Sequence, residues 1–97
     1  MKQFLLLHIG FVPPTPEIME KWNEWFASIA DQTVAQQGFM GGKEISASGT
    51  VDLPWDKDAF TGFNIIEAES MEAAVAIAKE NPFISSIRVY ELRPNEA

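Results

Sequence analysis

The stretch that decides the fold runs from Phe60 to Pro94 and reads FTGFNIIEAESMEAAVAIAKENPFISSIRVYELRP. Residues 61–68 alternate between the two sides of an extended chain and are rich in β-forming residues, which indicates a strand. Ser70 is a good helix N-cap, and the alanine-rich residues 71–80 have the apolar spacing of a helix that Asn81 and Pro82 end. Because residues 86–93 alternate again, the stretch predicts a strand, a helix and a second strand.

The residues before this stretch predict a second unit of the same kind. Residues 3–11 form an apolar run with a period of two, too short to span a bilayer, so we expect a strand and not a membrane segment. A helix is expected over residues 16–36, with Thr15 as N-cap, Pro16 in its first turn and apolar side chains at three-to-four spacing. Residues 42–48 are expected to form the next strand, and residues 49–58 a charged loop with some hairpin character.

This element order predicts an α+β fold of the ferredoxin-like, split βαβ type. We expect one domain over residues 1–97, with a four-stranded antiparallel sheet, both helices on one face, and strands 3–11 and 61–68 in the centre. Alternation predicts a helix-facing set, which comprises Leu5, Leu7, Ile9, Phe63, Ile65, Ile87 and Val89. The opposite, open face is then expected to carry Phe4, Leu6, His8, Asn64, Ile66, Arg88, Tyr90 and Leu92.

The predicted open face is too apolar to be left in water and too polar for an ordinary core. Monomers rarely expose contiguous apolar patches, so we expect a second copy of the chain to cover this face. A cleft that holds a small organic ligand is expected near the same interface. The sequence therefore predicts a homodimer.

Composition excludes several classes of partner and cofactor. The formal charge of −7 and the pI near 4.5 oppose binding to nucleic acid or to anionic membrane surfaces. The absence of cysteine excludes disulfides and thiolate catalysis and agrees with a cytoplasmic location. No nucleotide, flavin or zinc motif is present, and the acidic loop with Asp52, Asp56 and Asp58 lacks the pattern of a calcium loop. We expect no metal and no cofactor.

Three segments carry a resemblance to a known family. They are KQFLLLHIGF leading into TPEIMEKWNEWF, then GGKEIS, and finally GFNIIEAESMEAAVAIAKENP followed by VYELRP. They resemble YCII-related (DGPF-type) domains of the dimeric α+β barrel superfamily. The resemblance implies a homodimer with two sheets packed face to face, in a superfamily that includes cofactor-free enzymes.

The family's proposed His-Asp pair is not found in this chain. The resemblance implies a histidine in the first helix and an aspartate before the proline after the second helix. Trp22 and Trp25 stand near the first position, and Asn81 occupies the second. VDLPWDKDAFT replaces the DGPF signature. These catalytic roles are therefore not transferred to this chain.

His8 remains the candidate catalytic residue, because an imidazole can act as general acid or base near neutral pH. The alternative is an imidazole that only packs at an interface. Further candidates for ligand binding, each with a structural alternative such as core packing, helix capping or ion pairing, are Asn64, Arg88, Tyr90, Trp22 and Asn81.

Two functional classes follow from these observations. The favoured one is a non-catalytic, small-molecule-binding or regulatory module that lacks the His-Asp pair. The alternative is a cofactor-free small-molecule enzyme of the lyase, isomerase or hydrolase type, with His8 as acid or base.

Overall fold

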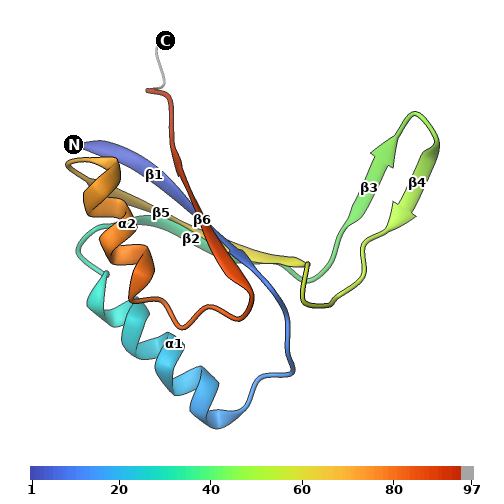
Figure 1. The fold of residues 1–97 in the computed structure, drawn as a ribbon, viewed down its shortest axis with the longest axis horizontal. Coiled ribbons are helices and arrows are strands. Elements are labelled where there is room, and N and C mark those ends of the chain that lie inside the picture. Colours follow the sequence, from blue (N-terminus) through green and yellow to red (C-terminus); the bar gives the residue numbers. More distant parts are fainter. Residues whose placement is uncertain (95–97) are drawn as a thin grey trace.

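The chain has a ferredoxin-like α+β fold with a four-stranded antiparallel sheet, in the strand order β2-β5-β1-β6, and both helices on one face of it (Figure 1). The computed structural model describes residues 1–94. Its elements are β1 (Lys2–Ile9), α1 (Pro16–Ser28), β2 (Thr33–Gly38), β3 (Lys43–Ser46), β4 (Gly49–Asp52), β5 (Phe60–Ala68), α2 (Met71–Lys79) and β6 (Ser86–Glu91). The predicted fold class and the central position of β1 and β5 are confirmed.

Both helices begin at the residues that the sequence indicates. The Thr15 hydroxyl accepts a hydrogen bond from the Ile18 N–H at the start of α1, and the Ser70 hydroxyl accepts one from the Ala73 N–H at the start of α2. Such N-caps satisfy backbone donors that have no partner within the helix. No helix within residues 1–94 is long and apolar enough to cross a membrane.

The predicted length of the first helix is wrong. α1 ends at Ser28, and residues 33–36, which we expected to be helical, belong to the edge strand β2 (Thr33–Gly38) on β5. The chain turns at Ile29, whose carbonyl accepts hydrogen bonds from the Thr33 hydroxyl and N–H. β-Branched Thr33 and Val34 then favour extended backbone, and the free edge of β5 supplies its hydrogen bonds.

The segment at residues 42–48 is a strand, but it does not join the main sheet as we expected. β3 pairs only with β4, and the two form a separate hairpin that extends away from the body of the molecule (Figure 1). The hairpin character of residues 49–58 is thus found at Gly49–Asp52. Within this hairpin, Ile45 is 80% exposed and Val51 is 56% exposed.

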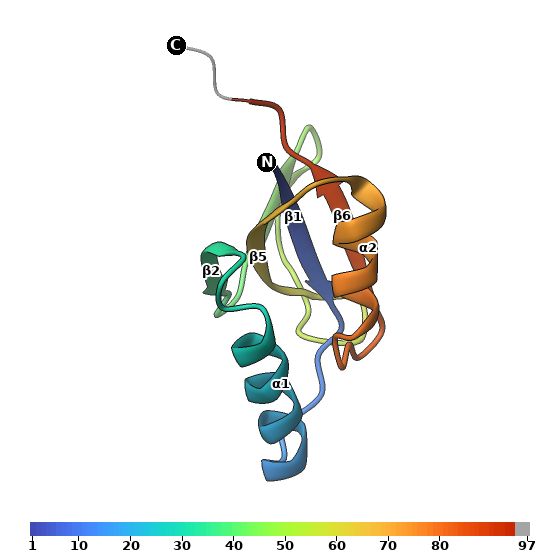
Figure 2. The same cartoon turned by 90° about the vertical axis from the view of Figure 1, so that its left-hand side faces the viewer.

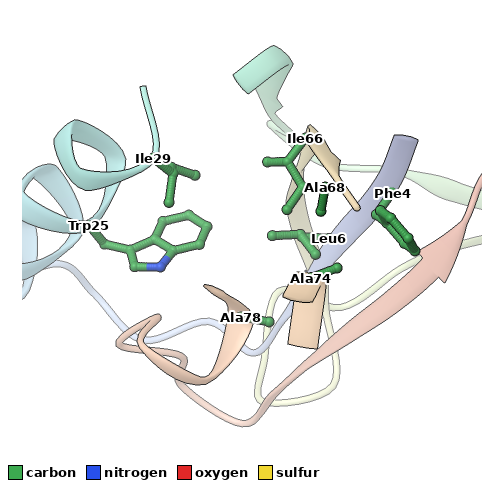
Figure 3. Packing of buried hydrophobic residues seen from close by; sticks show 8 residues of the cluster. All are labelled: Phe4, Leu6, Trp25, Ile29, Ile66, Ala68, Ala74 and Ala78. Carbon is green, nitrogen blue, oxygen red and sulfur yellow. The ribbon is translucent and has the colours of Figure 1, made fainter. Parts of the chain in front are cut away.

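The predicted faces of β1 and β5 are reversed. Leu6 lies opposite both Asn64 and Val89, and directly opposite residues share a face of the sheet. The side chains that pack with the helices include Phe4, Leu6 and Ile66, each 0% exposed (Figure 3). Leu5, Leu7, Phe63 and Ile65 therefore lie on the outer face, half-buried, together with exposed Arg88 and Tyr90.

The two helices lie at different distances from the sheet. α2 packs closely on β1, β5 and β6 through the small side chains of Ala74 and Ala78. No Cα atom of α1 lies within 8 Å of one in another helix or strand, and large aromatic side chains span the distance. Figure 2 shows α1 below and beside the sheet, away from α2. This wide separation leaves room for a cavity beside α1.

Candidate functional site

The candidate site is a cavity between α1 and the sheet, which we call the His8 cavity. Its volume is about 520 Å³, within the usual range for small-molecule pockets. The residues that line it come from α1, β1, β2 and β5 and are His8, Trp22, Phe26, Gln36, Gln37, Gly38, Thr61, Gly62, Phe63 and Asn64. None of them is an acid, a lysine or an arginine, so the cavity suits an uncharged ligand.

His8 is held in a fixed orientation at the wall of this cavity. It points from β1 toward the helices and is only 6% exposed. Its ring meets Trp22 edge to face at a centroid distance of 4.9 Å and Trp25 at 5.8 Å. Its Nε2 lies 2.6 Å from the Asn64 Oδ1. Since an amide oxygen only accepts hydrogen bonds, Nε2 is the nitrogen that carries the proton.

The environment keeps the imidazole neutral. Burial lowers the pKa of His8 below its usual value, while the hydrogen bond to Asn64 acts in the opposite direction and has the smaller effect. A ring with a lowered pKa is uncharged at pH 7 and can accept a proton there.

A short polar chain leads from His8 to the edge of the sheet. The Asn64 Nδ2 donates a hydrogen bond to the Gln36 Oε1 at 3.0 Å, which joins β5 to β2. The strands approach closely because β5 has a glycine beside this point. A Cβ atom at Gly62 would lie 2.7 Å from the Gln37 carbonyl oxygen.

Two buried polar side chains have atoms without hydrogen-bond partners among residues 1–94. These atoms are the His8 Nδ1 and both amide atoms of Asn81. Asn81 is 4% exposed, follows the C-cap residue Glu80 of α2, and does not line the His8 cavity. Unpaired buried polar atoms are rare in proteins and often mark functional groups or buried water.

The structure thus brings three of the predicted site residues together and separates the others. His8, Asn64 and Trp22 meet at the His8 cavity, on the helix side of the sheet and not on the open face where we expected His8 and Asn64. Arg88 and Tyr90 lie on the outer face, where the Arg88 guanidinium stacks 5.7 Å from the centre of the Phe60 ring. They cannot contribute to the same cavity within one chain.

Sequence reasoning missed several residues of the cavity. Gln36 was hidden because its segment was predicted to be helical. Phe26 lies on the same apolar stripe as Trp22, so helical spacing could have indicated it. Thr61, Gly62 and Phe63 would have followed from the correct strand register, which alternation within one strand does not supply.

A second cleft, of about 450 Å³, lies at the base of the β3–β4 hairpin. Its lining is mainly apolar, with Phe39, Leu53, Trp55 and Phe60 among its members. It contains no buried polar side chain, so it offers less for oriented binding than the His8 cavity. Within residues 1–94, no group of three or more His, Asp or Glu side chains is arranged to hold a metal ion.

Among solved structures, the chain is similar to 5-chloro-2-hydroxyhydroquinone dehydrochlorinase (TftG) from Burkholderia phenoliruptrix AC1100, in complex with 2,5-dihydroxybenzoquinone. The TM-score is 0.58 over 96% of this chain and 95% of that chain. Identity is 13%, so the likeness is one of fold. No model of a protein family matches the chain, and no curated protein is similar to it in sequence.

Proposed function

We propose that the chain is a small-molecule-binding protein whose ligand occupies the His8 cavity. The observation that carries this proposal is the orientation of His8, which is buried at the cavity wall, fixed by Asn64 and in edge contact with two tryptophans of α1. A packed core has little need for a polar group with an unpaired nitrogen, because a buried group without a partner costs about 1–3 kcal/mol. A ligand that supplies the missing partner would offset that cost.

The lining indicates the class of ligand. Trp22 and Phe26 offer aromatic surfaces, while the Asn64 and Gln36 amides offer hydrogen bonds. These features fit an uncharged, planar ring with hydroxyl or carbonyl substituents. The similar structure was solved with 2,5-dihydroxybenzoquinone, which supports a single ring with hydroxyl and carbonyl substituents.

Titration of His8 signals by NMR tests this proposal. Phenol and 4-methylphenol are uncharged probes of the right size at pH 7, and benzoate is an anionic probe of similar size. We expect the two phenols to shift the His8 ring signals in a saturable way and benzoate to leave them unchanged. Because this chain has a single histidine, the assignment is unambiguous.

A pair of tryptophan variants controls the location of binding. Trp22 lines the His8 cavity and Trp55 lines the cleft at the hairpin. Trp22→Leu should weaken binding of 4-methylphenol at least tenfold, whereas Trp55→Leu should leave it within twofold. Circular dichroism shows whether each variant is folded. Equal loss in both variants, or binding of benzoate alone, would overturn the proposed site.

A second candidate is a cofactor-free enzyme in which His8 acts as acid or base. The neutral state of the His8 ring favours it, since a neutral imidazole is a competent base at pH 7. The similar structure is a dehydrochlorinase, so chloride release from 5-chloro-2-hydroxyhydroquinone is the first reaction to measure. Release above the uncatalysed rate that is lost in His8→Gln would support catalysis. Release at the uncatalysed rate in both proteins would leave ligand binding as the function.

We also propose that the chain forms a homodimer through the outer face of its sheet and is a cytoplasmic YCII-related protein. Leu5, Leu7, Phe63 and Ile65 form an apolar patch on this face, and Tyr90 beside them is 46% exposed. The sequence resemblance described above supports the family, and the similar fold supports the face-to-face arrangement. The His8 cavity lies on the other side of the sheet, so it does not depend on the partner's covering this patch.

A further inference from the structure

We propose that Gln36 is a positioning residue that sets, through Asn64, which nitrogen of the His8 ring carries the proton. This role for Gln36 deepens the proposed function, because it concerns the same cavity. The observation that carries it is the pair of hydrogen bonds that join His8, Asn64 and Gln36. In this arrangement Nε2 carries the proton, and Nδ1 presents a lone pair.

The argument begins with the two ends of a primary amide. One end, the oxygen, only accepts hydrogen bonds, and the other, the NH₂ group, only donates them. Asn64 uses Nδ2 to donate to the Gln36 Oε1 at 3.0 Å and therefore turns Oδ1 toward His8 Nε2, at 2.6 Å. Because Gln36 offers an acceptor, Asn64 turns its oxygen, and not its NH₂ group, toward the His8 ring.

If the two amides were turned around, the ring proton of His8 would move to the other nitrogen. If Gln36 turned its NH₂ group toward Asn64, two NH₂ groups would meet, and the Asn64 amide would turn as well. Asn64 would then donate to Nε2, and the ring proton would move to Nδ1. Because Gln36 and Asn64 are directly opposite on β2 and β5, strand pairing keeps them in contact.

The tautomer determines what a ligand must bring to the site. The His8 Nδ1 is buried and has no partner within residues 1–94. With the proton on Nε2, an occupant that reaches Nδ1 must supply a donor, such as a hydroxyl group. A carbonyl oxygen would meet a lone pair and be repelled. At Nδ1, the tautomer set by Gln36 therefore favours a hydroxyl group over a carbonyl group.

NMR of protein labelled with ¹⁵N-histidine tests this directly, since the neutral tautomers give different shifts at the two ring nitrogens. At pH 8 we expect the wild type to show a protonated Nε2 and an unprotonated Nδ1. Gln36→Val removes the acceptor and should convert this pattern into a mixture, with at least a fivefold rise in the minor tautomer. In Gln36→Glu the carboxylate can only accept hydrogen bonds, so this variant should keep the wild-type pattern.

The matched control is Gln37→Val. Gln37 is the same residue type on the same strand, but it lies opposite Phe63 on the other face, and its amide donates to Gly38. The tautomer should not change in this variant. Both glutamines are exposed, so the amide spectra of both variants should remain dispersed.

Four results would overturn the proposal. They are a wild-type proton on Nδ1, an unchanged tautomer in Gln36→Val, a mixture in Gln36→Glu, or an equal change in Gln37→Val. The experiment contains no ligand, so its failure is separate from failure of the proposed function. If the tautomers behave as expected while phenols do not bind, the positioning role of Gln36 stands and the ligand proposal falls.

Discussion

His8 couples the stability of the fold to pH. Its pKa is lowered in the folded state, chiefly by burial, so below the usual value of about 6.5 the unfolded chain binds a proton that the folded chain does not. The His8 contribution to stability is therefore complete above that pH and is lost as the pH falls toward the folded-state pKa. Urea unfolding from pH 7.5 to 5.5 should show the loss, with a slope of at most about 1.4 kcal/mol per pH unit.

His8→Gln provides the control for this pH dependence. Glutamine does not titrate, and its amide can still reach Asn64, so the slope between pH 7.5 and 5.5 should largely disappear even if overall stability drops. If the pH dependence of stability persisted in His8→Gln, other titratable groups would be its cause. A slope of opposite sign in the wild type would mean that the folded state holds the histidine proton more tightly than the unfolded chain.

The sequence identified His8 as a candidate but not its surroundings. It is the only histidine, so it was the single candidate for an imidazole acid or base. Its contact with Asn64 depends on the register of β1 against β5, and its contact with Trp22 depends on which face meets α1. β1 has apolar residues on both faces, so alternation shows which residues share a face but not which face meets the helices.

Among the elements, the pairing of β2 with β5 depends on Gly62. A Cβ atom there would be 2.7 Å from the Gln37 carbonyl oxygen, which is backbone and cannot move without shifting the strand. Gly62→Ala should destabilise the fold by about 1–3 kcal/mol, as overpacked sites do. Gly41→Ala is the control, because within residues 1–94 its added Cβ would have no atom within 4 Å other than those of Gly41 and its chain neighbours. Denaturant midpoints compare the two, and similar values would contradict this account of the strand pairing.

α1 is attached to the molecule by its aromatic side chains. Trp25 is 4% exposed, and its indole N–H donates to the Ile77 carbonyl of α2 at 3.2 Å. Trp25→Ala should therefore cost about 3–5 kcal/mol in the free energy of unfolding. Met19→Ala, on the same helix at a position that is 55% exposed, should cost less than about 0.5 kcal/mol. If Trp25→Ala were as mild as Met19→Ala, the indole would not be the attachment.

The helix ends that are marked by a capping residue or a helix-breaking residue were predicted well. Thr15-Pro16 and Ser70 mark both helix starts, and Asn81-Pro82 marks the end of α2. The end of α1 had no such marker, since Ala30, Asp31 and Gln32 are compatible with helix, and propensity alone did not reveal the turn. The edge strand β2 forms because β5 needs a partner, which is information from tertiary structure.

For the whole molecule, the apolar patch on the outer sheet face predicts a dimer. Light scattering at micromolar concentration should give about twice the 10.8 kDa of one chain. Leu7→Glu places a carboxylate within the patch and should yield folded monomers, because burying an unpaired charge opposes association. Leu7 is half-buried in the single chain, whereas Leu6 belongs to the core, where a charge would unfold the protein itself.

Ala27→Glu is the matched control for the dimer. It introduces the same charge at an exposed position of α1, on the opposite side of the sheet, and should leave the mass unchanged. Tyr90→Glu provides a second test in the patch if Leu7→Glu proves insoluble. A wild-type mass near 10.8 kDa would overturn the dimer and would leave the His8 cavity unaffected.

Among residues 1–94, the β3–β4 hairpin packs on no other strand or helix, so a single chain can lose it without losing its core. Two-stranded hairpins are only marginally stable alone, and its amides should exchange with deuterium far faster than those of β1 and β5. Its tip at Ala47 and Ser48 is a natural place to cut the chain and to create new termini. A circular permutant opened there, with the original ends joined by a flexible linker, should still fold and keep the His8 cavity. The connectivity of the polypeptide can therefore be changed at this point. If the permutant does not fold, the hairpin must supply contacts that a single chain does not show.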